Sequence, residues 1–423
     1  MEKSDFENKK SKKEKKMYIK RSIESIIKKT AKDYPVLLVT GPRQVGKTTV
    51  LKMCEKEKFN YVSLDKLSER MMAKETPELF LQRYKAPLVI DEVQYAPELF
   101  PYIKAIVDEQ QENGMYWLTG SQQFHLMKNV TESLAGRIAV LKLLGFSQRE
   151  KLDTKNNESF VPSEKYISYV LNKKIKNIEI NHLYETIWRG SFPKINVNKN
   201  MDWEIFYSSY LETYIERDIK SLSNINNELT FVKFMTALAA RTGQLLNYSD
   251  ISKDIGISEV TVKAWVSLLR TSGIIYLLEP YYKNISKRMI KMPKIYFLDT
   301  GFACYLTKWN TPEVLQAGAM NGAFFETYVI SEIIKSYWHN GRQAPIYFYR
   351  DKDKKEIDIL IEENGILYPV EIKKTDTPTK DDIGNFKILE TSKLKIGEGA
   401  VVCLASNYIP LTEKVNILPI NYL

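Results

Sequence analysis

The chain has 423 residues, of which 44% are hydrophobic and 27% are charged, and its formal net charge is +10. This length predicts two to three domains. No apolar run approaches the roughly 20 residues that span a bilayer, so we expect no membrane partner. The three cysteines and three histidines are scattered without the spacing of metal ligands. That pattern predicts a reducing, cytoplasmic location, with neither disulfides nor structural zinc.

The first 21 residues are rich in basic side chains, with nine Lys or Arg against four acidic residues. Such a segment has little apolar surface to bury, so we predict a basic flexible arm over residues 1–21. Two roles are open for this arm. It is either a solubilising tail or a non-specific arm that binds phosphates.

The stretch "GPRQVGKT", residues 41–48, fits the spacing G-x-x-x-x-G-K-[ST] and follows the apolar run "VLLVT". In this motif backbone N–H groups cradle phosphates, the lysine reaches the β- and γ-phosphates, and the hydroxyl binds Mg²⁺. The helix that follows presents its positive N-terminal end to the same anion. We therefore predict that ATP and Mg²⁺ bind here, with Lys47 catalytic and Thr48 a metal ligand. The expected contacts are Gly41, Pro42, Arg43, Gln44, Val45, Gly46, Lys47, Thr48 and Thr49.

A second apolar strand ends in two acids, in "APLVIDEVQ" at residues 86–94. Adjacent acids at the end of a buried strand are costly unless they serve a cation. We assign Asp91 to the nucleotide's Mg²⁺, and Glu92 to polarising the attacking water as a catalytic residue.

A third strand, in "MYWLTGSQ" at residues 115–122, ends in polar Thr119 and Ser121. Either side chain could sense the γ-phosphate, and we count Ser121 among the candidate nucleotide contacts. Arg137 lies just before another strand and has two interpretations. It is an arginine finger, in cis or from a neighbouring subunit, or it forms an ordinary ion pair. Arg43, inside the loop, has the same ambiguity.

Strands are expected at about 36–40, 61–65, 87–91, 115–120 and 138–144, alternating with helical stretches. This alternation predicts an α/β domain over 22–147, a P-loop NTPase parallel sheet with helices on both faces. In such a sheet the ligand and the catalytic groups lie at the carboxyl ends of the strands.

These residues resemble those of the AAA-type P-loop ATPases. More narrowly, they are similar to a large prokaryotic family in which such an ATPase precedes a C-terminal domain of unknown function. The resemblance covers nearly the whole chain and rests on "GPRQVGKTT", "LVIDEVQ", "LTGSQ", "LAGR", "YLETYIERDI" and "KIYFLDTGFACYL". The first two motifs mark any P-loop ATPase, whereas the combination is much more specific. The resemblance implies a homo-oligomer, because an arginine of one subunit commonly completes the next subunit's site in such ATPases.

A helical lid or linker region is expected over 148–245, followed by a winged helix-turn-helix over 246–310. In the second segment a short helix, a turn at Gly256 and a longer helix from about Ser258 to Thr271 precede two strands. The hairpin between the strands is basic, through Lys283, Lys287, Arg288, Lys291 and Lys294. Phosphate contacts from this wing fit better than base reading. The alternative is a winged helix that serves as a protein–protein spacer.

The segment 311–423 resembles the PD-(D/E)XK nucleases, which have the restriction-endonuclease-like α/β fold. Two alternating strands flank an "ENG" turn, with Asp358 in the first strand and Glu371 and Lys373 in the second. In this resemblance Asp358 and Glu371 bind Mg²⁺, and Lys373 either orients the attacking water or stabilises the phosphorane-like charge, so all three are candidate catalytic residues. Glu326, from the preceding helix, completes the metal site. The sequence has "EID" where the family's motif has proline and aspartate.

The sequence therefore predicts a Mg²⁺-dependent ATPase that couples its nucleotide state to a nucleic-acid-binding C-terminal domain. That domain is a candidate nuclease, and DNA is the favoured nucleic acid over RNA. The alternative is a non-nucleolytic, ATP-switched assembly or signalling protein whose nuclease-like fold only binds a partner.

Overall fold

The computed structural model describes most of the chain outside its N-terminal segment. The described residues are 18–54, 59–121, 130, 133–154, 156–173, 175, 177–216, 227–281, 292–351, 353–391 and 394–423. Nearly all of the predicted basic arm, and the hairpin residues Lys283, Lys287, Arg288 and Lys291, lie outside this set. No helix among the described residues has both the length and the apolar character needed to cross a membrane.

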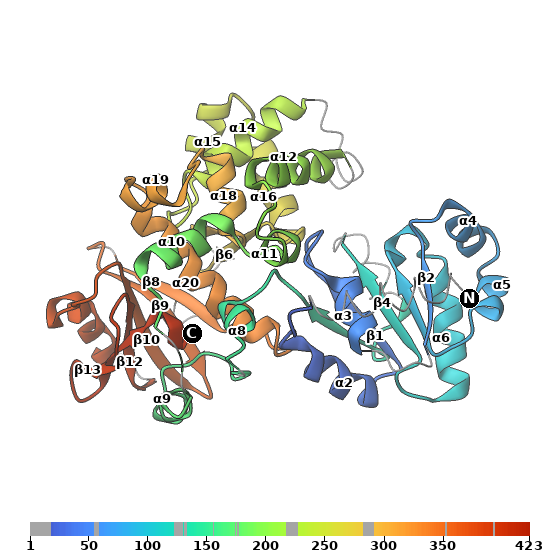
Figure 1. Ribbon diagram of the computed structural model, residues 1–423, viewed down its shortest axis with the longest axis horizontal. Coiled ribbons are helices and arrows are strands. Elements are labelled where there is room, and N and C mark those ends of the chain that lie inside the picture. Colours follow the sequence, from blue (N-terminus) through green and yellow to red (C-terminus); the bar gives the residue numbers. More distant parts are fainter. Residues whose placement is uncertain are drawn as a thin grey trace.

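The N-terminal part contains the parallel sheet that the sequence predicts, at the blue end of the chain in Figure 1. Its strand order is β2-β3-β4-β1-β5, and every neighbouring pair is parallel. The last strand ends two residues earlier than expected, so residues 143 and 144 leave the sheet toward the rest of the chain. The strands are β1 (Val36–Thr40), β2 (Asn60–Ser63), β3 (Leu88–Asp91), β4 (Tyr116–Gly120) and β5 (Ile138–Lys142).

Helices cover both faces of this sheet. Side chains alternate between the two faces along each strand, so each strand packs against helices on both sides. Leu37 and Val39 pack on one side with α2 (Ile23–Asp33) and α3 (Lys47–Cys54). Val36 and Leu38 pack on the other side, against a second set of helices. That set is α4 (Leu67–Glu75), α5 (Pro77–Arg83) and α6 (Leu99–Gln110).

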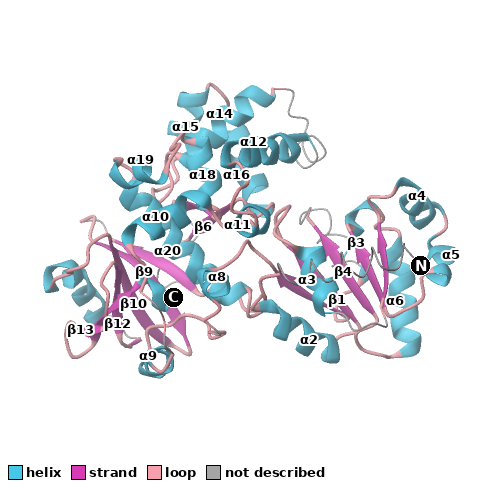
Figure 2. Ribbon diagram, viewed as in Figure 1, coloured by secondary structure: helices cyan, strands magenta, loops and turns pink. Residues whose placement is uncertain are grey.

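The middle of the chain is helical, as predicted, and ends in a two-stranded antiparallel pair (Figure 2). Gly256 adopts φ +75° at the turn between two helices, and Ser258 caps the second helix by accepting from the Thr261 N–H. This order is the one expected for a winged helix-turn-helix, an assignment that stays a prediction. The elements are α8 (Gln148–Leu152), α9 (Glu164–Leu171), α10 (Ile180–Arg189), α11 (Pro193–Val197), α12 (Trp203–Tyr214), α14 (Glu228–Ala239), α15 (Tyr248–Ile255), α16 (Glu259–Thr271), β6 (Ile275–Leu278) and β7 (Lys294–Phe297).

The C-terminal part is a seven-stranded mixed sheet with a long helix, α20 (Asn321–Trp338), against it. The predicted hairpin is present, with Asn364 and Gly365 at φ +53° and +75° in its turn. The main strand path is β13-β14-β12-β10-β9-β8, and β11 pairs with β10. The remaining elements are α18 (Thr300–Leu306), α19 (Pro312–Ala317), β8 (Ile346–Arg350), β9 (Glu356–Glu363), β10 (Ile366–Lys373), η3 (Lys380–Thr391), β11 (Lys395–Ile396), β12 (Gly399–Cys403), β13 (Ile409–Pro410), β14 (Val415–Pro419) and η4 (Ile420–Tyr422).

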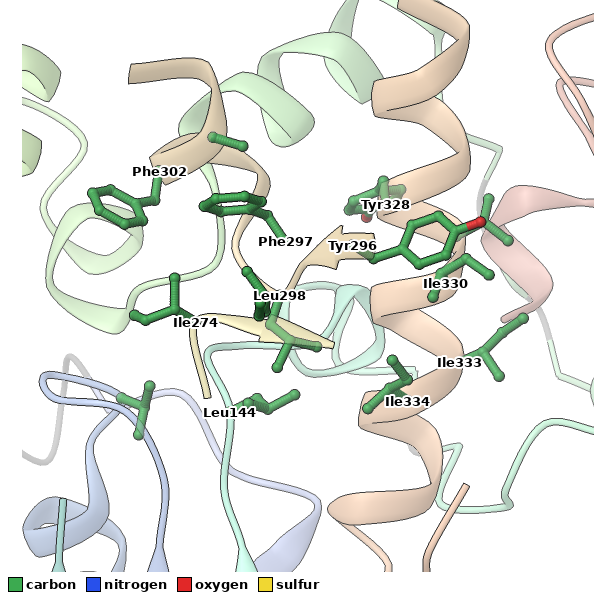
Figure 3. Close-up of a cluster of buried hydrophobic side chains, with 14 of the residues drawn as sticks. Leu144, Ile274, Tyr296, Phe297, Leu298, Phe302, Tyr328, Ile330, Ile333 and Ile334 are labelled. Atoms are coloured by element: carbon green, nitrogen blue, oxygen red, sulfur yellow. The ribbon is translucent and has the colours of Figure 1, made fainter. Parts of the chain in front are cut away.

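One hydrophobic core runs from the first face of the parallel sheet into the middle and C-terminal parts. Figure 3 shows Leu144, just after β5, lying below Ile274 and Leu298 of the strand-pair region, with Ile334 of α20 beside them. These side chains are almost completely buried. The P-loop region and the C-terminal sheet are therefore joined by packed side chains, through which displacement can pass.

Candidate functional site

The predicted phosphate loop turns tightly at the carboxyl end of β1, and its backbone requires glycine. A Cβ on Gly41 would lie 2.0 Å from the Leu143 carbonyl oxygen, and φ is +151° there. Gly46 adopts φ +90°, and Gln44 adopts φ +62°. Such angles are strained for residues with a side chain, and α3 begins directly afterwards at Lys47. The N–H groups at the start of α3 are thus available to an anion.

Lys47 lies folded along this loop, with only 6% of its surface exposed. Its ammonium donates to the carbonyl oxygens of Gly41 at 3.0 Å and Pro42 at 2.8 Å. The carbonyls that hold this buried ammonium are neutral. Phosphate oxygens carry negative charge and bind an ammonium more strongly, so they can replace the carbonyls.

The predicted Mg²⁺ ligands meet beside the loop. The Thr48 hydroxyl donates to Asp91 Oδ1 at 2.6 Å, across 43 residues of sequence. Thr119 donates to the same oxygen, and the Tyr61 hydroxyl donates to Asp91 Oδ2 at 3.1 Å. A hydroxyl and a carboxylate next to a phosphate loop fit Mg²⁺, which keeps several waters and takes its other ligands from substrate phosphates.

Glu92 adopts a left-handed conformation, with φ +59°, just past the end of β3. Its N–H donates to the Thr119 hydroxyl at 3.1 Å, while its carboxylate accepts from Gln94 and, at 3.4 Å, from the Ser121 hydroxyl. A residue other than glycine at this angle is often found where a side chain has to be aimed at a functional site. The Thr119 hydroxyl therefore hydrogen-bonds to the Asp91 carboxylate, whereas the Ser121 hydroxyl hydrogen-bonds to the Glu92 carboxylate.

Arg137 is not brought to the loop. It precedes β5, and its carbonyl accepts from the Val36 N–H at the start of β1, so it lies at the amino-terminal ends of these strands, whereas the loop follows the carboxyl end of β1. Its guanidinium forms an exposed pair with Asp108 at the end of α6. Within one chain the ion-pair interpretation therefore agrees with the geometry, and an arginine finger in cis does not.

Arg21, which we placed in the flexible arm, is instead buried with 3% of its surface exposed. Its guanidinium donates to the carbonyl oxygens of Val45 at 2.9 Å, inside the phosphate loop, and Leu144 at 2.7 Å, and it pairs with Glu150 at 3.1 Å. The sequence prediction was wrong here, because a run of basic residues gives no sign that one of them returns to the core. Arg21 ties the loop to the segment that leads into the middle region.

Glu150 is the centre of this connection. It accepts from the N–H groups of Ser22 at 2.8 Å and Ser147 at 2.9 Å, and it faces His339 of the C-terminal part at 3.4 Å. Burial alone would raise the pKa of Glu150, but Arg21 and His339 together hold it well below its usual range. Burial lowers the pKa of His339, and its Nε2 atom accepts from the Leu144 N–H at 3.3 Å.

The predicted acids of the C-terminal part lie on adjacent strands. The β9–β10 pairing ends with Val370 opposite Ile359, and Glu371 and Asp358 occupy the next position in the same register. The Ile372 N–H donates to Asp358 Oδ2 at 2.9 Å, and Lys373 pairs with Glu371 at 2.9 Å. Burial and the neighbouring Glu371 carboxylate raise the pKa of Asp358 well above its usual range, and burial raises that of Glu371. The second carboxylate oxygen of Glu371 is buried and has no hydrogen-bond partner among the described residues.

Glu326 does not complete a metal site with these acids. Its carboxylate is held by the Lys294 ammonium at 3.3 Å and by the Tyr296 hydroxyl at 2.5 Å, both from β7. Nowhere in the described chain do three or more His, Cys, Asp or Glu side chains come together to hold a metal ion. The predicted three-carboxylate metal site is therefore not formed, because an ammonium lies among the acids instead.

Sequence reasoning missed the roles of Arg21, Tyr61, Gln94 and Tyr296. Gln94 is part of the quoted "DEVQ" and lies two residues from Glu92, so its spacing was an available signal. Arg21 and Tyr296 act across 24 and 30 residues respectively, and no local pattern reveals such contacts.

Residues 33–152 match the family model described as an AAA domain. Residues 180–313 and 321–423 match two models described as domains of unknown function, DUF8612 and DUF4143. The N-terminal part of the chain is thus an AAA-type P-loop domain. The two models that cover the later parts assign them neither a winged helix nor a nuclease fold.

Several known proteins are similar along much of the chain. Uncharacterized proteins of Mycobacterium bovis and Mycobacterium tuberculosis are each 26% identical over 394 residues, which is 91% of this chain and 80% of theirs. The Holliday junction branch migration motor RuvB of Thermotoga maritima is 16% identical, over 60% of this chain and 86% of its own, with a TM-score of 0.29. AMPPCP-bound DnaA from Aquifex aeolicus is 14% identical, over 58% and 86%, with a TM-score of 0.28. Such low TM-scores carry no argument, so the ATPase assignment rests on the AAA domain match and the loop geometry.

Proposed function

We propose that this chain, whose N-terminal part is an AAA-type P-loop domain, hydrolyses ATP with Mg²⁺. We also propose that its nucleotide state is transmitted to a C-terminal part that binds nucleic acid. The observation that carries the first half is the contact between Thr48 and Asp91, 2.6 Å apart at the mouth of the phosphate loop. Thr48 and Asp91 would hold Mg²⁺, whose positive charge, when the ion is bound, would offset the negative charge that develops on the phosphates. Lys47 holds the phosphates, Thr48 and Asp91 hold the metal, and Glu92 accepts the proton of the attacking water.

The coupling rests on direct contacts of the loop with later parts of the chain. Pro42 packs on Gly273, two residues after the end of α16, where an added Cβ would lie 3.0 Å from the Pro42 ring. Arg21 joins the Val45 carbonyl to Leu144 and Glu150, and Leu144 donates to His339 at the end of α20. A change in the loop's shape on nucleotide binding therefore acts directly on the strand pair and on the C-terminal helix.

A hollow of about 500 Å³ behind the loop supports the nucleic-acid half of the proposal. Lys142 and Arg270 line it, and the Lys142 ammonium lies 4.6 Å from the centre of the Trp338 ring. Tyr276 and Tyr347 also line it. Burial and the neighbouring Arg270 charge lower the pKa of Lys142. Two neighbouring positive charges suit the phosphates of a single-stranded nucleic acid. The aromatic rings beside them suit its bases, which stack on such side chains.

Replacing Glu92 with glutamine should leave ATP affinity near the wild-type value and lower the rate of hydrolysis by about 100-fold or more, as expected for loss of a general base. The amide keeps the size of the side chain and its contacts with Gln94 and Ser121, so the site should stay assembled. Calorimetric titration with ATP and a phosphate-release assay measure the two effects. Replacing the exposed Glu109 of α6 with glutamine is the control, and it should change neither. An unchanged hydrolysis rate in Glu92→Gln would remove the assigned role.

Replacing both Lys142 and Arg270 with methionine should weaken binding of a fluorescent single-stranded oligonucleotide. The slope of log affinity against log salt should fall by about 0.7 for each phosphate that the variant no longer neutralises. Fluorescence anisotropy at several salt concentrations, with single-stranded DNA and RNA of the same sequence, measures both. The control replaces the exposed Lys104 and Lys308 with methionine. Equally weakened binding in both double variants, or no binding by the wild type, contradicts this placement of the interface.

The second candidate function is an ATP-switched assembly or signalling protein that cleaves nothing. The observation that favours it is Lys294, whose ammonium lies among the acids where the nuclease interpretation needs a metal ion.

A further inference from the structure

Lys294 is the first residue of β7 and is almost fully buried, with 4% of its surface exposed. Its ammonium lies 3.3 Å from Glu326 Oε1 and 2.5 Å from Glu356 Oε1. These acids come from α20 and from the start of β9, so one lysine from the strand pair bridges two elements of the C-terminal part. Lys294 is also close enough to Asp358 for its positive charge to favour the ionised form of that carboxyl, which acts to lower its pKa.

The charges around Lys294 explain why a cation is needed at this place. Four acids face it or one another: Glu326, Glu356, Asp358 and Glu371. Carboxylates in a buried setting are costly unless a cation or a shared proton compensates them. Arg350 also pairs with Glu356, and Lys373 pairs with Glu371. No cation other than Lys294 forms an ion pair with Glu326 in the part of the chain described here.

The position of Lys294 depends on the segment that touches the phosphate loop. Lys294 pairs in register with Leu278 at the end of β6, and β6 begins two residues after Gly273, which packs on Pro42. The Leu298 N–H, just after β7, donates to the Ile274 carbonyl at 3.0 Å. A shift of Gly273 would therefore move the strand pair, and with it the ammonium.

We propose that Lys294 is a built-in counter-ion that keeps divalent metal out of the Asp358–Glu371 site, and that movement of the β6–β7 pair withdraws it. The exclusion of metal rests on the two ion pairs that place the ammonium beside this site and on its electrostatic interaction with Asp358. Its release by nucleotide rests on the proposed coupling to the phosphate loop. The site is then closed in the arrangement described here, and a metal ion competes directly with an ammonium fixed to another part of the chain.

Replacing Lys294 with methionine tests the exclusion without any nucleotide. Methionine keeps the length and the apolar contacts of the side chain but removes the charge, so Glu326 is left without its paired cation and Glu356 keeps only Arg350. Titration with Mn²⁺, followed by electron paramagnetic resonance, should show one site bound at least about 10-fold more tightly than in the wild type. The double variant Lys294→Met/Asp358→Asn should lose this site. The matched control, Lys308→Met at an exposed position, should behave as the wild type.

Stability provides a second readout that does not depend on activity. Because Glu326 loses its paired cation and Glu356 loses one of two, Lys294→Met should melt at a lower temperature, and Mn²⁺ should restore much of the loss in this variant but not in the wild type. A folded Lys294→Met protein that gains no Mn²⁺ site overturns the proposal. So does a wild-type protein that binds Mn²⁺ tightly in a way that Asp358→Asn abolishes, a comparison that does not require the lysine variant to fold.

The nucleotide arm separates this proposal from the proposed function. Adding a non-hydrolysable ATP analogue to the wild type should increase its Mn²⁺ affinity at the Asp358–Glu371 site, measured as the part that Asp358→Asn removes. If Lys294→Met gains the site but the analogue has no effect on the wild type, the counter-ion stands and its control by nucleotide is wrong.

Discussion

Replacing Lys47 with alanine should abolish measurable ATP binding and lower hydrolysis by at least about 100-fold, the effect expected when a preorganised charge partner of the phosphates is removed. The lysine is buried, and two loop carbonyls already aim its ammonium along the loop. Without it, the phosphates lose the buried ammonium that the loop carbonyls hold beside them. Calorimetric titration with Mg²⁺-ATP and a phosphate-release assay give the two quantities.

The control for this experiment is Lys104→Ala, on the exposed side of α6, which should keep wild-type affinity and rate. Circular dichroism of both variants checks that the fold is retained. Wild-type nucleotide affinity in a folded Lys47→Ala protein would contradict the assignment of the loop.

Replacing Arg21 with methionine should lower the free energy of unfolding by about 3–5 kcal/mol, the usual result of removing one partner of a buried ion pair. The variant leaves Glu150 buried without its guanidinium and frees the Val45, Leu144 and Gly145 carbonyls. Urea unfolding followed by circular dichroism measures the change. The matched control is Arg137→Met, which breaks an exposed pair with Asp108 and should have no measurable effect.

The Arg21 effect should also depend on pH in one direction. Glu150 has a depressed pKa in the folded chain, so its stabilisation is complete above its unfolded pKa of about 4.3 and is lost as pH falls toward the folded value. The stabilities of the wild type and Arg21→Met should therefore converge in acid. Equal destabilisation by Arg21→Met and Arg137→Met at neutral pH would contradict the role of Arg21.

The phosphate loop and the strand acids were predictable because their signals are local. Glycine spacing, a following helix and a buried strand that ends in Asp91 are all written in short stretches of sequence. The hairpin of the C-terminal part was predictable for the same reason, since the turn at Asn364 and Gly365 sets the register that places Glu371 opposite Asp358.

Arg21 and Lys294 were misjudged because each belongs by composition to a basic run but by contact to a distant site. Arg21 bonds to residues more than 120 positions away, and Lys294 to Glu326 and Glu356. The sequence predicted that both residues would contact solvent or phosphates. In the structure they form ion pairs with buried carboxylates, which bind a cation more strongly than water-exposed partners do.

Hydrogen exchange with and without a non-hydrolysable ATP analogue tests most directly whether the phosphate loop controls the far end of the chain. With Mg²⁺ present, we expect the analogue to slow exchange in residues 41–50 and also to change it in residues 273–278 and 294–298. Lys47→Ala should show neither effect. Protection confined to residues 41–50 would mean that nucleotide binds but is not coupled to the strand pair, and it would contradict the account.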